Sequence, residues 1–378
     1  MITWRAGVVD EVGAAWEGAQ ELVVALDHPW ADPGLPARVK ALAYPLLTGP
    51  VDKGSRVLLN VSALARGLGT GGYAFVVGPE GAVPRDTQRG PGHLVKARYT
   101  PLQAMVLGVD DQESEHHDVL RDADDLGGMP VVVADLHSAL PAIVAGARLA
   151  AQRTGRPAPR VAYVMTDGGA LPAWFSRTVA GLREAGWIST CITVGQAFGG
   201  DLEAVSVHTG LLAARLVDGA DLAVVAQGPG NLGTGTRWGF SGIAAGDAVN
   251  AVATLGGRPV ASLRVSGADP RGRHRGVSHH SLTAYGRVAL VPADVVVPVP
   301  DLGDNALSEL GRHVRDQVKE LVAPAGRHRL VELRVDDELR AALAASPVRL
   351  STMGRSLEQD PLAFLAAGAA GVHAEHLV

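Results

Sequence analysis

The second part of the chain alternates short apolar runs with longer amphipathic stretches, and this alternation restricts the fold more than any other feature. Apolar runs that resemble buried strands occupy residues 129–134, 160–165, 188–194, 222–226 and 260–265. Helical periodicity fills the intervals at about 139–152, 171–185, 204–217 and 240–255. Apolar strands joined by helices are typical of a parallel sheet covered on both faces. We therefore predict a mostly parallel, Rossmann-like α/β sheet flanked by helices over residues 111–378.

The remainder of this second part extends the same pattern. Further strands are expected at 294–299, 329–335 and 348–351, and a terminal helix at 360–378. Asp360-Pro361 suits the start of that helix, with aspartate as its cap and proline at its first position.

Residues 1–110 lack long helical patterns and show short strands separated by turn residues. Candidate strands lie at 2–12, 21–26, 37–47, 56–61, 73–77 and 94–109. Short strands at this spacing favour a small all-β domain, either a barrel or a sandwich. An acidic stretch over 110–125 marks the change between the two patterns.

Composition excludes several classes of protein. No apolar run reaches membrane-spanning length, so we expect a soluble, cytoplasmic protein without a membrane partner. The net charge of −5 argues against nucleic-acid binding, which requires a basic face. The single cysteine, Cys191, excludes an internal disulfide and cysteine-rich metal sites, and its apolar surroundings favour a buried thiol. The oligomeric state stays open, with a homo-oligomer among the alternatives.

The loops that follow the predicted strands are unusually rich in polar residues and glycine. Ligands bind in such loops, because the carboxyl ends of parallel strands meet at one edge of the sheet. Histidine is the usual proton carrier at neutral pH, so we predict His137, His279 and His280 as catalytic, with Asp135 and Asp167 as partners. Four of these residues could instead bind a metal, namely Asp135, His137, Asp167 and His279. A structural hydrogen bond or a surface position is the alternative for any one histidine.

The loop after the fourth strand is rich in glycine. Gly228, Gly230 and Gly233 fit the pattern G-x-G-x-x-G, placed between a strand and a predicted helix. Glycines allow backbone N–H groups to approach an anion at the start of a helix. No acidic residue ends the following strand to bind a ribose, which argues against a complete dinucleotide site. A glycine-rich turn selected for packing alone is the alternative.

Arginines are concentrated in the next loop, and guanidinium groups suit phosphate or carboxylate. A solvated basic loop is the alternative interpretation. The residues predicted to bind a small anionic ligand are Gly168, Gly169, Gly228, Gly230, Asn231, Gly233, Thr234, Gly235, Thr236, Arg271, Arg273, Arg275 and Arg355.

Several motifs taken together resemble one known family. They are Val57-Leu58-Leu59-Asn60, Gly69-Thr70-Gly71-Gly72-Tyr73, Asp135-Leu136-His137-Ser138, Thr166-Asp167-Gly168-Gly169, Gly228–Gly235 and Ser278-His279-His280-Ser281. The combination resembles a bacterial family catalogued as domain of unknown function 3866. The resemblance covers nearly the whole chain, including 353–355 and 366–371, and it implies no activity.

Three functions therefore remain open from the sequence. The first is an enzyme that acts on a small anionic or phosphorylated metabolite, with glycine-rich loops for binding and histidines for acid/base chemistry. The second is a metal-dependent hydrolase that uses the Asp/His set. The third is a non-catalytic binding or interaction protein. The motifs identify no cofactor.

Overall fold

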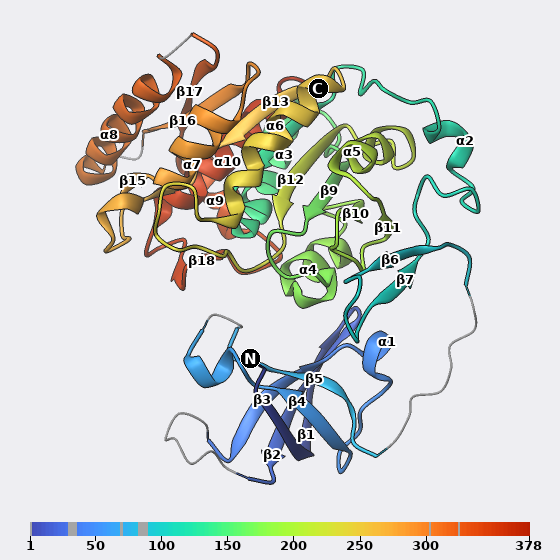
Figure 1. Cartoon of the computed structure of the whole chain (residues 1–378). Coiled ribbons are helices and arrows are strands. Elements are labelled where there is room, and N and C mark those ends of the chain that lie inside the picture. The colour runs from blue at the N-terminus through green and yellow to red at the C-terminus, as the bar shows by residue number, and fades with distance from the viewer. Residues whose placement is uncertain (1, 29–35, 69–70, 82–89, 302–303, 324–325) are drawn as a thin grey trace. The chain divides into compact units, whose positions relative to one another are not determined.

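Five strands near the N-terminus close into a barrel (Figure 1). The computed structural model describes residues 2–28, 36–68, 71–81, 90–301, 304–323 and 326–378. Barrel order is β1-β2-β3-β5-β4, and the strands are β1 (Trp4–Trp16), β2 (Ala19–Leu26), β3 (Arg38–Ala43), β4 (Arg56–Asn60) and β5 (Ala74–Pro79).

The barrel has its own apolar interior because alternate strand residues point inward. Leu22, Val24 and Leu26 of β2 are buried, and β4 contributes Val57 and Leu59. Because the sheet closes on itself, the first of the two predicted alternatives, a barrel rather than a sandwich, is present. Short elements accompany the barrel: α1 (Pro45–Thr48), η1 (Leu64–Arg66), β6 (Leu94–Lys96) and β7 (Ala104–Val106).

Two strand predictions in this region are wrong in part. The strand expected over 37–47 ends at Ala43, because Pro45–Thr48 forms α1. The expected strand over 94–109 is two short strands, β6 and β7. Ala97 and Tyr99, which lie between them, have φ angles of 49° and 62°. Such angles belong to the left-handed region and end an extended strand.

Eight parallel strands form the sheet of the second unit. Its order is β11-β10-β9-β12-β8-β13-β16-β17, and every neighbouring pair is parallel. The strands are β8 (Pro130–Ala134), β9 (Val161–Thr166), β10 (Thr190–Thr193), β11 (Leu202–Glu203), β12 (Leu222–Gln227), β13 (Arg258–Ser262), β16 (Asp294–Pro300) and β17 (Arg329–Val335). The barrel and this sheet confirm the predicted fold class.

Helices cover both faces of this sheet (Figure 1). One face carries α3 (Leu140–Arg153), α9 (Asp337–Ala344) and α10 (Pro361–Glu375), which pack against one another. The other carries α5 (Val207–Leu216), α6 (Ala244–Thr254) and α8 (Asn305–Val322). Shorter helices are α2 (His117–Leu120), α4 (Arg177–Glu184) and α7 (His279–Thr283). None of the described helices is long and apolar enough to cross a membrane.

Helix α10 is buried along almost its whole length, and glycines let it approach α3 closely. A Cβ atom added to Gly371 would lie 1.9 Å from the carbonyl oxygen of Ile143, and one on Gly146 would lie 2.0 Å from that of Gly368. The helix begins as predicted, with Pro361 at its first position. Asp360, however, makes no capping bond; its carboxylate binds Ser266, the backbone of Gly267 and Arg355 instead.

Smaller differences from the prediction occur near the C-terminus. Neither α8 nor α9 was expected from the sequence. The expected strand at 348–351 is reduced to β18 (Ser351–Thr352), which pairs with β19 (Arg355–Ser356). A second small antiparallel pair consists of β14 (Val265–Ser266) and β15 (Gly276–Val277).

The chain divides into two compact units by its internal contacts. The first comprises residues 1–91 and 95–106, and the second comprises 92–94 and 107–378. Within the second, the loop after β8 leads to α3 on one face, whereas the loops after its neighbours β12 and β13 lead toward the other face. Such a change of direction opens a crevice at the carboxyl ends of the strands, where ligands bind in open α/β sheets.

Candidate functional site

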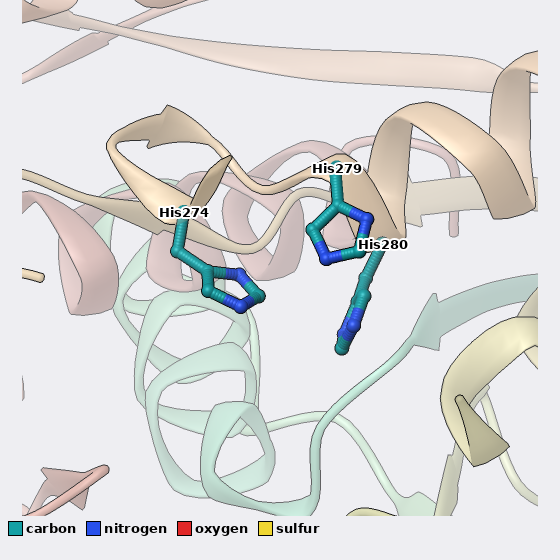
Figure 2. Close-up of side chains that lie close together, drawn as sticks. All are labelled: His274, His279 and His280. Carbon is teal, nitrogen blue, oxygen red and sulfur yellow. The ribbon is translucent and has the colours of Figure 1, made fainter. Parts of the chain in front are cut away.

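Three histidine side chains gather in the segment that follows β13 (Figure 2). His274 ends the short 3-10 helix η5 (Gly272–His274), while His279 and His280 begin α7. One ring nitrogen from each lies within 4.8 Å of the other two. We call these three residues the histidine cluster.

Local hydrogen bonds fix the orientation of these rings. The pairing of β14 with β15 turns the chain so that His274 reaches the start of α7. The Ser278 hydroxyl caps α7 by accepting from the backbone N–H of His280, and it bonds Nδ1 of His274 at 2.7 Å. Phe240 stacks on His280, with ring centroids 3.9 Å apart.

The surroundings of all three imidazoles favour their neutral form. Burial is the main cause and lowers the pKa of His274 to about 4 and that of His280 to about 3, with the positive charge of Arg264 acting in the same direction. Burial also lowers the pKa of His279, and Arg273 contributes. A neutral imidazole has one nitrogen lone pair, and Nε2 of His279 is buried without a hydrogen-bond partner.

Arg264 lies between the histidine cluster and Asp135. Its guanidinium donates to Nδ1 of His280 at 3.1 Å. Asp135, which follows β8, is fully buried, and its Oδ2 has no hydrogen-bond partner. Burial raises the pKa of Asp135 to about 6, and the charge of Arg264 opposes this rise.

Gln227, the last residue of β12, connects the predicted loops to the cluster. Its amide donates to the backbone oxygen of Asp135 at 3.1 Å and to Oδ1 of Asn231 at 3.2 Å. The Asn231 amide nitrogen in turn lies 3.5 Å from Nδ1 of His280. Asp135 also lines two small cavities of about 30 and 10 Å³. Both are too small for a metabolite, since ligand pockets occupy roughly 300 Å³ or more.

A larger pocket, of about 670 Å³, borders the histidine cluster at His279. Arginines from three segments line it: Arg237, Arg273 and Arg287. Arg287 comes from a π-helical turn (Ala284–Val288) that continues α7. Within the described part of the chain, none of these arginines forms an ion pair. The volume suits a small-molecule ligand.

A family model described as Protein of unknown function (DUF3866) matches residues 40–371. The chain belongs to this DUF3866 family. Comparison with curated proteins and with solved structures gives no match. The DUF3866 span includes the histidine cluster and the arginine-lined pocket, but the family description gives neither an activity nor a ligand.

His137 of this DUF3866 chain lies in the core, and both of its ring nitrogens have partners. Nδ1 is 2.9 Å from the Tyr163 hydroxyl, and Nε2 is 2.7 Å from that of Ser176. The Tyr163 hydroxyl also contacts the carbonyl oxygens of Ala226 and Gln227, to which it donates. It therefore accepts from Nδ1 of His137, and Nε2 accepts from Ser176, so the neutral ring is fully bonded.

Asp167 also has a local partner. Its carboxylate accepts from the backbone N–H of Gln196 at 2.8 Å and lies against Gly195. No contact among the described residues joins Asp167 or His137 to the histidine cluster. Of the predicted metal ligands Asp135, His137, Asp167 and His279, only His279 belongs to it.

The glycine-rich loop of this DUF3866 member does not lead directly into a helix. Helix α6 begins at Ala244, and residues 232–238 are an exposed turn in which the N–H of Thr234 donates to the carbonyl oxygen of Gly239. The geometry expected for phosphate bound at a helix N-terminus is therefore absent between Gly228 and Gly233. Of the predicted loop residues, Gly235 lines the arginine-lined pocket, whereas Gly233, Thr234 and Thr236 do not.

Close packing accounts for other glycines in this region. A Cβ on Gly169 would lie 2.1 Å from the carbonyl oxygen of Gly228, and one on Gly228 would lie 2.4 Å from that of Ala170. A Cβ on Gly168 would lie 2.5 Å from Oε1 of Gln227. Gly230 is different: it has open space but a φ of 89°.

The predicted arginines separate into two groups. Arg271 and Arg355 form ion pairs with Asp269, and Arg355 also pairs with Asp360. Arg273 lines the pocket, while Arg275 is exposed.

Five contributors to this site were not among the site residues predicted from the sequence: Gln227, Arg237, Arg264, His274 and Arg287. Gln227 had a detectable signal, because it is a polar residue that ends an apolar strand.

Proposed function

We propose that this protein is an enzyme that binds a small anionic substrate in the arginine-lined pocket. The observation that carries the proposal is the meeting of Arg237, Arg273 and Arg287, each without an ion pair in the described structure, with the unpartnered His279. Several arginines elsewhere in the second unit have a carboxylate partner, as Arg153 has Asp336. Glu320 is a carboxylate in the same lining, so the three guanidinium groups leave the pocket with a net positive charge, which favours an anionic ligand in a chain of net charge −5.

Guanidinium groups also narrow the chemistry of the ligand. Their planar arrangement of donors matches the oxygens of phosphate or carboxylate. In this proposal arginine side chains, rather than backbone amides of the glycine-rich loop, bind the charged group. Leu282 and Leu321 line the same pocket and would contact an apolar portion of the substrate.

His279 lies in the pocket wall, but its unpartnered Nε2 is buried and would reach a ligand in the pocket only after the ring turns. Its neutral ring has a lone pair, which can take a proton from a ligand or bind a metal ion. Acid/base catalysis requires a proton carrier beside the substrate, and His279 is the basis on which we infer an enzyme.

Titration of metal-free protein with pyrophosphate and citrate tests the binding step. We expect Arg273→Gln, Arg237→Gln and Arg287→Gln each to weaken binding of the preferred anion about tenfold, because each removes a charged hydrogen bond. Arg340→Gln is the matched control, since Arg340 is an exposed arginine of α9 outside the pocket. Equal binding by wild type and all four variants contradicts the site.

The catalytic part needs a separate measurement. Wild-type protein is assayed with a panel of phosphate monoesters, phosphoanhydrides and carboxylic esters, and hydrolysis that the Arg273→Gln variant reduces is the expected result. Anion binding without turnover of any panel member contradicts an enzyme and leaves a binding protein.

A further inference from the structure

We propose that His274, His279 and His280 form a binding site for one divalent transition-metal ion, with Zn²⁺ as the expected ion. This inference deepens the proposed function and rests on it in one respect: a substrate would reach the ion through the arginine-lined pocket. The site itself is argued from the three side chains and their neighbours.

Geometry brings the ligand atoms close to the required spacing. Zinc binds imidazole nitrogen at about 2.1 Å, so tetrahedral angles place two such nitrogens about 3.4 Å apart. The nitrogens of the histidine cluster lie within 4.8 Å of one another. Closing that gap requires each pair of ring nitrogens to approach by no more than about 1.4 Å.

The hydrogen bonds of the cluster leave ligand atoms available on His274 and His279, whereas Nδ1 of His280 accepts from Arg264, and this bond has to break before that ring can bind a metal ion. Ser278 bonds Nδ1 of His274 and leaves its Nε2, and a ligating histidine typically has its second nitrogen held in this way. Nε2 of His279 is buried without a partner. A buried polar atom of this kind costs free energy unless a partner satisfies it, and a metal ion would do so.

The ligand type selects the class of metal. Three imidazoles suit Zn²⁺ and its first-row neighbours, whereas Mg²⁺ and Ca²⁺ prefer oxygen ligands. Catalytic zinc sites commonly use three protein ligands and keep another position for water or substrate. His279 borders the arginine-lined pocket, so that open position would be accessible to an anion bound there.

Positive charge near the cluster acts against a cation. Arg264 contacts His280, and Arg271 and Arg273 lie close enough to lower the pKa of His279. Two carboxylates offset this charge: Asp135 faces Arg264, and Asp269 pairs with Arg271. The remaining positive charge would be reduced further by an anionic substrate, so metal and substrate should support each other's binding.

Calorimetric titration of chelator-treated, full-length protein with Zn²⁺, repeated with Co²⁺ and followed by visible absorption, tests the site. We expect one ion per chain and a Co²⁺ spectrum that reports nitrogen ligands. His279→Gln and His274→Gln should weaken Zn²⁺ binding by about 100-fold or more, because each removes a ligand. His208→Gln is the control, since His208 is an exposed histidine of α5 in the same unit.

Two outcomes overturn the proposal. One is the absence of stoichiometric Zn²⁺ and Co²⁺ binding to wild type; the other is wild-type affinity in both cluster variants. Far-UV circular dichroism checks that each variant is folded. If a variant is unfolded, the titration of wild-type protein with Zn²⁺ and Co²⁺ still tests the proposal.

Failure here can be told apart from failure of the proposed function. Metal is titrated without an anion, and pyrophosphate is titrated without metal. If the protein binds pyrophosphate but not Zn²⁺, it has an anion-binding pocket whose chemistry depends on His279 itself. If it binds Zn²⁺ but not pyrophosphate, it has a metal site without the assigned substrate class.

Discussion

Two histidines of this chain show how neighbours determine the chemistry of an imidazole. His137 has a hydroxyl partner for each nitrogen, whereas Nε2 of His279 has none. The sequence places both after predicted strands and cannot separate them, because the hydroxyls that satisfy His137 come from Tyr163 and Ser176, 26 and 39 residues away. A histidine in the right loop is therefore only a candidate until its partners are known.

Replacing His137 should affect stability rather than binding. Burial lowers the pKa of His137 to about 4, so the folded state resists protonation and the stability present above pH 6.5 is lost as the pH falls toward 4. At pH 7.5 we expect His137→Leu to lower the free energy of unfolding by roughly 2–4 kcal/mol, since it breaks two buried hydrogen bonds.

Urea denaturation checks this prediction. Between pH 7.5 and pH 5 the wild type should lose about 2 kcal/mol more than the variant, because only the wild type has this group to protonate. Unchanged stability together with lost pyrophosphate binding would instead make His137 part of the functional site.

Asp135 should give the opposite dependence on pH. Its pKa in the folded chain is raised to about 6, so its contribution favours the folded state at low pH and is lost as the pH rises from about 4 through 6. The stability of the wild type relative to Asp135→Asn should fall by roughly 2 kcal/mol over that interval. Urea denaturation of both proteins at pH 4.5 and pH 7 measures the difference. A constant difference shows that the carboxyl is not perturbed.

At the level of elements, two glycines of the glycine-rich loop are required for different reasons: Gly228 for close packing and Gly230 for its backbone angle. Gly228→Ala should destabilise the protein by roughly 1–3 kcal/mol, because the added Cβ meets the backbone of Ala170. Gly230→Ala meets no atom and should cost about 1 kcal/mol through its positive φ alone. Thermal unfolding separates these effects.

Anion binding by the same two variants tests the original interpretation of the loop. If Gly230→Ala weakens pyrophosphate binding more than its small loss of stability explains, backbone amides take part in the site. If both variants bind pyrophosphate as the wild type does, the loop has only a structural role.

Buried strands were the elements that the sequence predicted best. The runs that became β8, β9, β12 and β16 are apolar on both faces, and such runs have few alternatives. Helices α8 and α9 were missed because their exposed faces are strongly polar, which hides a narrow apolar stripe. Their aspartate caps, Asp304 and Asp336, were the available signal.

The candidate site was less predictable than the sheet. The rule that ligands bind at the carboxyl ends of parallel strands predicts the loops from which the candidate site is built. It does not say which side chains in those loops meet. His274 reaches His279 because β14 pairs with β15, and Arg287 reaches the pocket because α7 continues into a π-helical turn. Both depend on packing that a pattern of residue types does not contain.

At the scale of the whole molecule, the two units have separate apolar cores. The barrel core and the core around the parallel sheet share no residue, and every residue of the candidate site belongs to the second unit. We therefore expect residues 107–378 expressed alone to unfold cooperatively and to keep the wild-type affinity for pyrophosphate. Circular dichroism melting and calorimetry measure this. Aggregation of the fragment, or loss of binding by a folded fragment, would show that the site depends on the first unit.

The position of α10 has a consequence for synthesis of the protein on the ribosome. This helix covers β8, β13 and β16 and packs along α3, yet it is translated after all of them. Until residues 361–375 emerge, the nascent chain has an apolar sheet face and the glycine-lined side of α3 exposed to water. The second unit can therefore complete its core only after residues 361–375 have been translated, and until then its uncovered face is the natural target of chaperones that bind apolar segments.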